Sequence, residues 1–126
     1  MRRVLVVEDD MDHFRLIEMV LNMIKITDVV HAKDGVEALK YIEEATSIFS
    51  LIISDLNMPN MTGLEFLEKV RQDNRHCVVP FIMVTAENSL SSAISAKDKG
   101  ATSFVGKPFV VDNLAGKIRT ALSMDF

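Results

Sequence analysis

Five short apolar segments recur along the chain, each separated from the next by enough residues to form a helix. They are RRVLVV (2–7), DVVHA (28–32), SLIIS (50–54), PFIMVT (80–85) and TSFVGK (102–107). Their apolar character is nearly continuous, without strict alternation, which is typical of strands covered on both faces. A regular alternation of such strands with helices predicts an α/β fold, in which helices cover both faces of a parallel sheet.

The intervening segments predict five helices, and two of them carry clear start signals. The helix after the second strand is expected to begin at Asp34, a residue that caps helices, with Glu37 in its first turn. The helix after the third strand begins with a capping box formed by Thr62 and Glu65. Apolar residues at helical spacing are expected to face the core: Val36, Leu39, Ile42; Leu64, Leu67, Val70; and Leu114, Ile118, Leu122 in the last helix.

The first predicted helix is apolar on more than one face. One stripe suffices for packing on a sheet, and it consists of Phe14, Ile17, Leu21 and Ile24. A second stripe consists of Leu16, Met19 and Met23. Two interpretations stay open: a wide contact with the core, or a docking surface on which adaptable Met side chains meet the helices of a partner.

The fourth predicted helix, in the segment NSLSSAISAKDKG (88–100), is expected to be the most weakly held. It contains four serines, has only Leu90 and Ile94 as sizeable apolar anchors, and ends near Gly100. Serine forms helices less readily than alanine, and few anchors leave little burial to compensate. The alternative is a surface helix that frays without functional consequence.

The composition is that of one compact domain spanning residues 1–126, with 48% apolar and 25% charged residues. No segment has the length or apolarity of a membrane-spanning helix or a signal peptide, so a cytoplasmic setting is expected. A single cysteine, Cys77, excludes an internal disulfide and is interpreted as a packing or loop thiol. The net charge of −4, without a basic cluster, argues against direct binding of nucleic acid or an anionic membrane.

Acidic residues gather where the predicted strands end. Ligands of open parallel sheets bind beyond the carboxyl ends of the strands. The first strand is followed by Glu8, Asp9 and Asp10, and the third by Asp55. If these two strands are neighbours, the carboxylates converge and repel one another, and a hard cation such as Mg²⁺ would relieve the repulsion. For Asp10 we favour a helix N-cap instead.

Two further residues follow the other strands at this edge. Lys107 taken alone would be a solvated charge, and Thr85 an ordinary strand residue. Opposite an acidic cluster, however, a lysine becomes a suitable partner for an anion or a phosphoryl group. The three histidines share no motif and are interpreted as surface or packing residues: His13, His31 and His76.

The motifs VLVVEDD, LIISDLNMPNMTGLEFL, FIMVTAE and KGATSFVGKPF resemble, in order and spacing, the signature of response-regulator receiver domains of two-component signalling. The resemblance covers essentially the whole chain. It implies a doubly wound, flavodoxin-like, five-stranded parallel sheet of order 2-1-3-4-5, an order that the chemotaxis regulator and flavodoxin illustrate. It also implies a cis Lys107–Pro108 bond.

The same resemblance implies a function and its residues. Asp55 would accept a phosphoryl group from a histidine kinase or a phosphotransfer protein, with Mg²⁺ as cofactor. Asp9 and Asp55 would ligate the metal directly, aided by Glu8 and by the backbone carbonyl of Asn57. Thr85 and Lys107 would bind the phosphoryl oxygens. An ionised aspartate attacks without a general base, so no catalytic histidine is required.

The remaining roles also come from the resemblance. Thr85 and Phe104 would form the conformational switch, although the second position is more often tyrosine, and Phe104 lacks its hydroxyl. A simple core role for Phe104 stays open. Asn57 and Glu87 would flank the path of the water that hydrolyses the phosphoryl group. Because both are polar and neither is bulky, a short-lived phosphoryl group is expected.

These features predict a stand-alone receiver that is monomeric or weakly dimeric. It would promote its own phosphorylation and dephosphorylation, but it would not be a conventional metabolic enzyme. Its output would be phosphorylation-dependent binding to an unknown protein through the fourth helix, fifth strand and fifth helix. Alternatives are a receiver fragment of a larger regulator or a phosphorylation-independent scaffold.

A flavodoxin-type flavin module is disfavoured because the acidic EDDMD segment would repel a phosphate. An aspartate-nucleophile phosphatase is disfavoured because its DxDx[TV] pattern belongs to the first strand.

Overall fold

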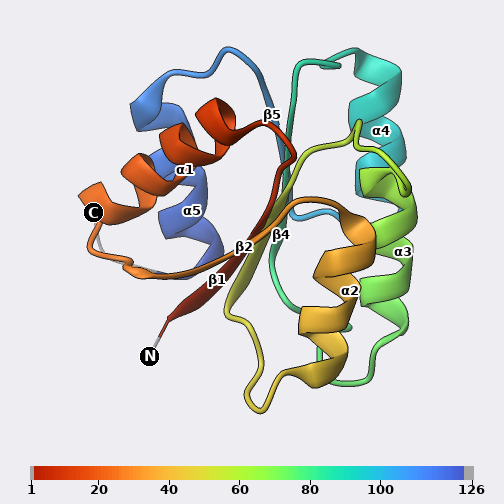
Figure 1. Ribbon diagram of the computed structural model, residues 1–126. Helices are drawn as coiled ribbons and strands as arrows, with labels where there is room; N and C mark the ends of the chain where they lie inside the picture. Colours follow the sequence, from red (N-terminus) through yellow and green to blue (C-terminus); the bar gives the residue numbers. More distant parts are fainter. Residues whose placement is uncertain (1, 124–126) are drawn as a thin grey trace.

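Strands and helices alternate along the chain in the computed structural model, which describes residues 2–123 (Figure 1). The strands are β1 (Arg3–Val7), β2 (Asp28–Ala32), β3 (Leu51–Ser54), β4 (Phe81–Thr85) and β5 (Ser103–Gly106). The helices are α1 (Met11–Met23), α2 (Gly35–Glu44), α3 (Gly63–Gln72), α4 (Leu90–Asp98) and α5 (Val111–Ala121). All paired strands are parallel, in the order β2-β1-β3-β4-β5. The predicted fold is therefore confirmed.

Successive strand residues point to opposite faces of the sheet and so build two separate cores. On β1, Val4 and Val6 pack in the core beneath α1 and α5, whereas Leu5 and Val7 pack in the core beneath α2, α3 and α4. Figure 1 shows the same division, with α1 and α5 on one side of the sheet and the other helices opposite. The central strands β1, β3 and β4 are almost wholly buried, while the edge strand β2 is only partly covered.

The expected helix starts are confirmed. Asp34 caps α2 by accepting a hydrogen bond from the Glu37 N–H at 2.8 Å. Thr62 and Glu65 form the reciprocal capping box of α3. Asp10 accepts from the backbone N–H groups of the first turn of α1, as its interpretation as an N-cap required. These caps fix the starts of the helices that follow β1, β2 and β3.

Several expected apolar contacts are wrong. Val36 is 43% exposed, and the small Ala38 is buried in its place. The supposed anchors of α4, Leu90 and Ile94, are 78% and 51% exposed, and Ala96 is the residue of that helix that is buried. A helix that lies close to a sheet contacts it through small side chains. A prediction based on large apolar residues does not identify these contacts.

The second stripe of α1 does not pack on the core. Leu16, Met19 and Met23 are 40%, 43% and 61% exposed. The interpretation as a wide core contact is therefore wrong, because Phe14, Ile17 and the neighbouring Val20 cover the sheet. Among residues 2–123, no helix combines the length and apolarity that crossing a membrane requires.

Candidate functional site

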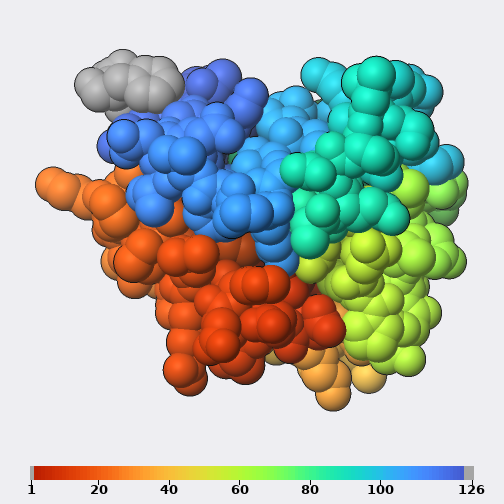
Figure 2. All heavy atoms as spheres, turned by 90° about the horizontal axis from the view of Figure 1, so that it is seen from above, coloured from red at the N-terminus to blue at the C-terminus, as the bar shows by residue number. Residues whose placement is uncertain are grey.

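The acidic residues were expected to converge if the first and third strands are neighbours. In the structure, β1 and β3 are hydrogen-bonded neighbours. Val7 is paired with Ser54, and the Asp55 N–H donates to the Val7 carbonyl at 3.1 Å. The residues that follow the two strands therefore leave the sheet side by side. Figure 2 views this edge from above, where the chain around residue 10 (red), residue 60 (yellow-green) and residue 107 (blue) comes together.

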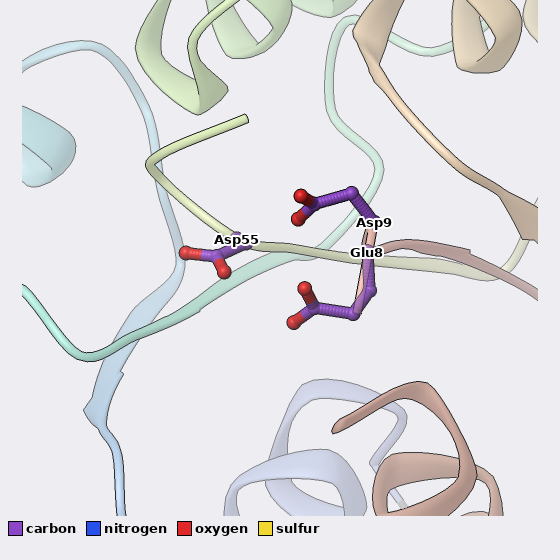
Figure 3. Close-up of side chains that lie close together, drawn as sticks. All are labelled: Glu8, Asp9 and Asp55. Carbon is purple, nitrogen blue, oxygen red and sulfur yellow. The ribbon is translucent and has the colours of Figure 1, made fainter. Parts of the chain in front are cut away.

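Glu8, Asp9 and Asp55 form a group whose carboxylate oxygens lie within 4.8 Å of one another. In Figure 3, Glu8 and Asp9 extend from the end of β1 toward the side on which Asp55 lies. Glu8 is buried, Asp55 is partly buried and Asp9 is exposed. The cluster thus runs from the protein interior to solvent, with Asp9 at its open end.

Lys107 reaches this cluster from the end of the edge strand β5. Its Nζ lies 2.5 Å from Glu8 Oε1 and 3.1 Å from Asp55 Oδ2, and its side chain is 8% exposed. The Lys107 N–H donates to the Thr85 carbonyl at 2.8 Å, and the Lys107–Pro108 bond is cis as predicted. One ammonium therefore neutralises part of the charge of two carboxylates.

Glu8 is held in place through both of its carboxylate oxygens. Oε1 accepts from Lys107, and Oε2 accepts from the Asp10 N–H at 3.2 Å. Burial raises the pKa of Glu8 above its ordinary value; the Lys107 hydrogen bond opposes this, and the charge of Asp55 adds to it. The mutual repulsion expected from the sequence is therefore present at Glu8, although burial is the larger cause.

The turn after β3 orients Asp55. Its Oδ1 accepts from the backbone N–H groups of Leu56 at 2.6 Å and Asn57 at 3.3 Å. Gly63 donates its N–H to the Leu56 carbonyl at 2.7 Å, and a Cβ at Gly63 would lie 2.9 Å from the Leu56 Cα. A glycine is needed here because α3 begins directly against the turn.

Asn60 stabilises the same turn in a way that the sequence did not reveal. Its φ of 70° lies in the left-handed region, which asparagine tolerates better than most residues. Its side-chain amide donates to Asp34 Oδ2 at 2.9 Å. The turn that carries Asn57 is thereby joined to the start of α2.

Thr85 lies at the same edge, buried at the end of β4. Its Oγ1 accepts from the Glu87 N–H at 3.2 Å. Asn57 and Glu87 both line an open cavity of about 210 Å³ between the turn after β3 and α4. Phe104 lies on the neighbouring strand β5, opposite Met83, and is partly buried against the core beneath α2, α3 and α4.

Two histidines lie against the site, which the sequence did not predict. His31 stacks on Phe14, with ring centroids 3.9 Å apart, and its Nε2 lies 2.7 Å from the Glu8 carbonyl oxygen. His13 is half exposed, and its Nδ1 lies 3.0 Å from Lys107 Nζ. His31 and the fully buried His76 are packing residues as expected, whereas the contact of His13 with Lys107 was not expected. Cys77 is exposed in the segment before β4, as a loop thiol.

The donor set fits a hard divalent cation. Carboxylate oxygens are ligands that Mg²⁺ prefers, and it usually retains several waters, which the open end at Asp9 would allow. The group contains three acids and one ammonium, so a cation would offset the remaining negative charge. The arrangement combines a carboxylate, a set of metal ligands and a fixed cation, which are the groups that phosphoryl transfer requires.

Comparison with known proteins gives a consistent result. The family described as "Response regulator receiver domain" matches residues 4–119. The chain is 36% identical to chemotaxis protein CheY1 of Helicobacter pylori over 95% of this chain and 96% of that protein. It is 34% identical to the chemotaxis protein CheY homolog of Campylobacter jejuni, covering 95% and 92%. The crystal structure of Vibrio cholerae chemotaxis protein CheY4 superposes with a TM-score of 0.87 at 35% identity, covering 97% and 99%.

Proposed function

This chain belongs to the response regulator receiver domain family, and we propose that it accepts a phosphoryl group on Asp55. Membership of the family implies a two-component kinase as the partner, and the donor in our proposal is a phosphohistidine of that kinase or of a phosphotransfer protein. The observation that carries the proposal is the position of Asp55, whose carboxylate lies within 4.8 Å of those of Glu8 and Asp9 and 3.1 Å from the Lys107 ammonium.

Mg²⁺ is the proposed cofactor. Asp9, Asp55 and the backbone carbonyl of Asn57 would hold it, and Glu8 would contribute charge. When bound, the ion neutralises charge that spreads over the transferring phosphoryl group. Both oxygens of the buried Glu8 already accept hydrogen bonds, whereas Asp9 is exposed at the open end of the cluster, which favours Asp9 over Glu8 as a direct ligand.

The transfer needs no proton acceptor on the receiver. An oxygen of the Asp55 carboxylate forms a bond to phosphorus while the P–N bond of the donor phosphohistidine breaks, and the bonding electron pair stays on the imidazole nitrogen. Lys107 and Thr85 would bind the phosphoryl oxygens. Lys107 is already within hydrogen-bonding distance of Asp55, so it need move little when the charge arrives.

The output in this proposal is phosphorylation-dependent protein binding through α4, β5 and α5, with Thr85 and Phe104 as the switch. The proposal treats residues 1–126 as one receiver domain in the cytoplasm, where the exposed Cys77 thiol would stay reduced. A receiver that belongs to a larger regulator, or that acts as a scaffold without phosphorylation, remains the alternative.

A mass measurement tests the proposal directly. Incubation with Mg²⁺ and acetyl phosphate should add one phosphoryl group to the wild-type chain and none to Asp55→Asn. Asp9→Asn should weaken Mg²⁺ binding markedly, whereas Asp10→Asn, which keeps a helix-capping side chain, is the matched control and should bind normally. Phosphorylation of Asp55→Asn, or equal Mg²⁺ affinity in Asp9→Asn, would contradict the assignment.

A further inference from the structure

The Lys107 ammonium has three acceptors around it. Two are the carboxylates of Glu8 and Asp55, and the third is Nδ1 of His13 at 3.0 Å. An ammonium carries three N–H donors and no lone pair, so Nδ1 of His13 must accept. With Nδ1 as the acceptor, all three donors of Lys107 are engaged.

The position of His13 is fixed by its backbone. Its N–H donates to Asp10 Oδ1 at 3.1 Å, which places it in the capped first turn of α1. His13 and Lys107 together help line a mainly apolar cavity of about 120 Å³. The other lining residues are Leu16, Pro108 and Phe109. The Lys107 side chain is thus nearly buried, whereas the His13 side chain beside it is half exposed.

A neutral acceptor suits this position better than a charged one. On phosphorylation, one oxygen of Asp55 becomes an ester oxygen, and Lys107 has to turn a donor toward the new phosphoryl oxygens. A third carboxylate beside Lys107 would compete with the phosphoryl group for the ammonium and add repulsion to an already acidic site. An imidazole holds one N–H of Lys107 without adding negative charge.

We propose that His13 is a positioning residue that orients the Lys107 ammonium toward the phosphoryl group on Asp55. The inference rests on the proposed function, because Lys107 is taken as the phosphoryl-binding cation. His13 itself touches neither metal nor phosphoryl group in this proposal and acts only through Lys107.

Substitutions that differ only in the acceptor separate this role from packing. His13→Leu removes the acceptor, and phosphorylation by acetyl phosphate at saturating Mg²⁺ should slow about 10-fold or more, as expected for one lost hydrogen bond to a charged group. In His13→Asn the side-chain oxygen lies near the former Nδ1 position, so the rate should recover. His13→Gln places its oxygen one bond farther out and should stay slow. Arg15→Leu, an exposed position on the same helix, is the control and should match wild type.

Equal rates for His13→Leu and wild type, or equal losses in the Asn and Gln variants, would overturn the inference. Failure of the wild-type chain to become phosphorylated would instead overturn the proposed function, so the two failures are distinguishable. A metal-free measurement gives independent evidence: in the nitrogen NMR spectrum of the imidazole, Nδ1 of His13 should be unprotonated and should shift in Lys107→Met. A proton on Nδ1, or an unchanged resonance in that variant, would refute the contact.

Discussion

Asp34 illustrates how one side chain can support the site from outside it. It accepts from the Glu37 N–H that begins α2 and from the Asn60 amide of the turn after β3. These hydrogen bonds lower the pKa of Asp34, the Glu37 N–H having the larger effect. The ionised form is therefore stabilised in the folded state.

The lowered pKa gives a pH-dependent prediction. A group with a lowered folded-state pKa stabilises the protein above its unfolded pKa of about 3.9, and that contribution is lost as the pH falls through the folded pKa. Asp34→Ala should lose about 1–2 kcal/mol at neutral pH, and the difference from wild type should shrink below about pH 4. Denaturant unfolding across this range measures it. Asp34→Asn keeps an acceptor, so it should lose less at neutral pH; a loss in Asp34→Ala that does not change with pH would contradict the assignment.

Asn57 and Glu87 lead to a prediction about phosphoryl lifetime. They line the same open cavity, and the Ser92 hydroxyl donates to Glu87 Oε2 at 3.3 Å. Neither side chain is bulky enough to exclude water, so Asn57→Leu and Glu87→Leu should each slow the decay of the phosphorylated protein several-fold. The decay is followed after removal of the phosphodonor. Ser95→Ala, in the wall of the same cavity, should decay like wild type; unchanged decay in both leucine variants would refute the gating role.

Contacts between local partners could be predicted from spacing alone, whereas the contact of His13 with its distant partner could not. The caps at Asp34 and Thr62 bind N–H groups three residues ahead, so spacing alone predicts them. His13 meets Lys107 across 94 positions, and no motif contains both. The acid and lysine positions themselves were expected because strand order brings strand ends together, whereas the identity of the third Lys107 acceptor depends on the orientation of α1.

At the scale of elements, the strands and helices were predicted well and their buried faces less well. The faces of α2 and α4 were misassigned because Ala38 and Ala96, rather than larger apolar residues, seat these helices. Side-chain size at a helix–sheet contact depends on how closely the helix approaches the sheet. Hydrophobic spacing carries no information about that distance.

The exposed stripe of α1, formed by Leu16, Met19 and Met23, gives a prediction at this scale. Leu16 also lines the cavity beside Lys107, so the stripe begins at the site. If it docks the helices of a kinase, Met19→Ser should lower phosphoryl transfer from the kinase several-fold while labelling by acetyl phosphate and the unfolding midpoint stay unchanged. Ile17→Ser, on the buried face of the same helix, should reduce all three. A parallel loss of kinase transfer and stability in Met19→Ser would count against docking.

At the scale of the whole molecule, the sheet separates two cores and holds its helices with unequal strength. Helices α1, α2, α3 and α5 each bury at least three residues, whereas α4 buries only Ala96. The C-terminal end of α4 is tied to α3 by Arg71, which donates to the Gly100 carbonyl at 2.8 Å, and by the Lys99–Glu68 ion pair at 3.2 Å. Its N-terminal half has Leu90 and Ile94 facing outward. The attachment of α4 is therefore asymmetric.

This asymmetry predicts where a phosphoryl signal spreads. The hydroxyl of Ser92, in the first turn of α4, donates a hydrogen bond to the Glu87 carboxylate, and the Glu87 N–H donates to Thr85 Oγ1. A movement of the Thr85 hydroxyl toward a phosphoryl group would therefore release the start of the helix. Each serine lowers the stability of a helix by roughly 0.5 kcal/mol relative to alanine. The attached and the released states of α4 are therefore expected to lie close in free energy. Amide hydrogen exchange over residues 88–99 should therefore be faster than in α3 before phosphorylation, and should change on phosphorylation most strongly in the N-terminal half. Protection equal to that of α3, or protection that phosphorylation leaves unchanged, would show that α4 is not the responding element.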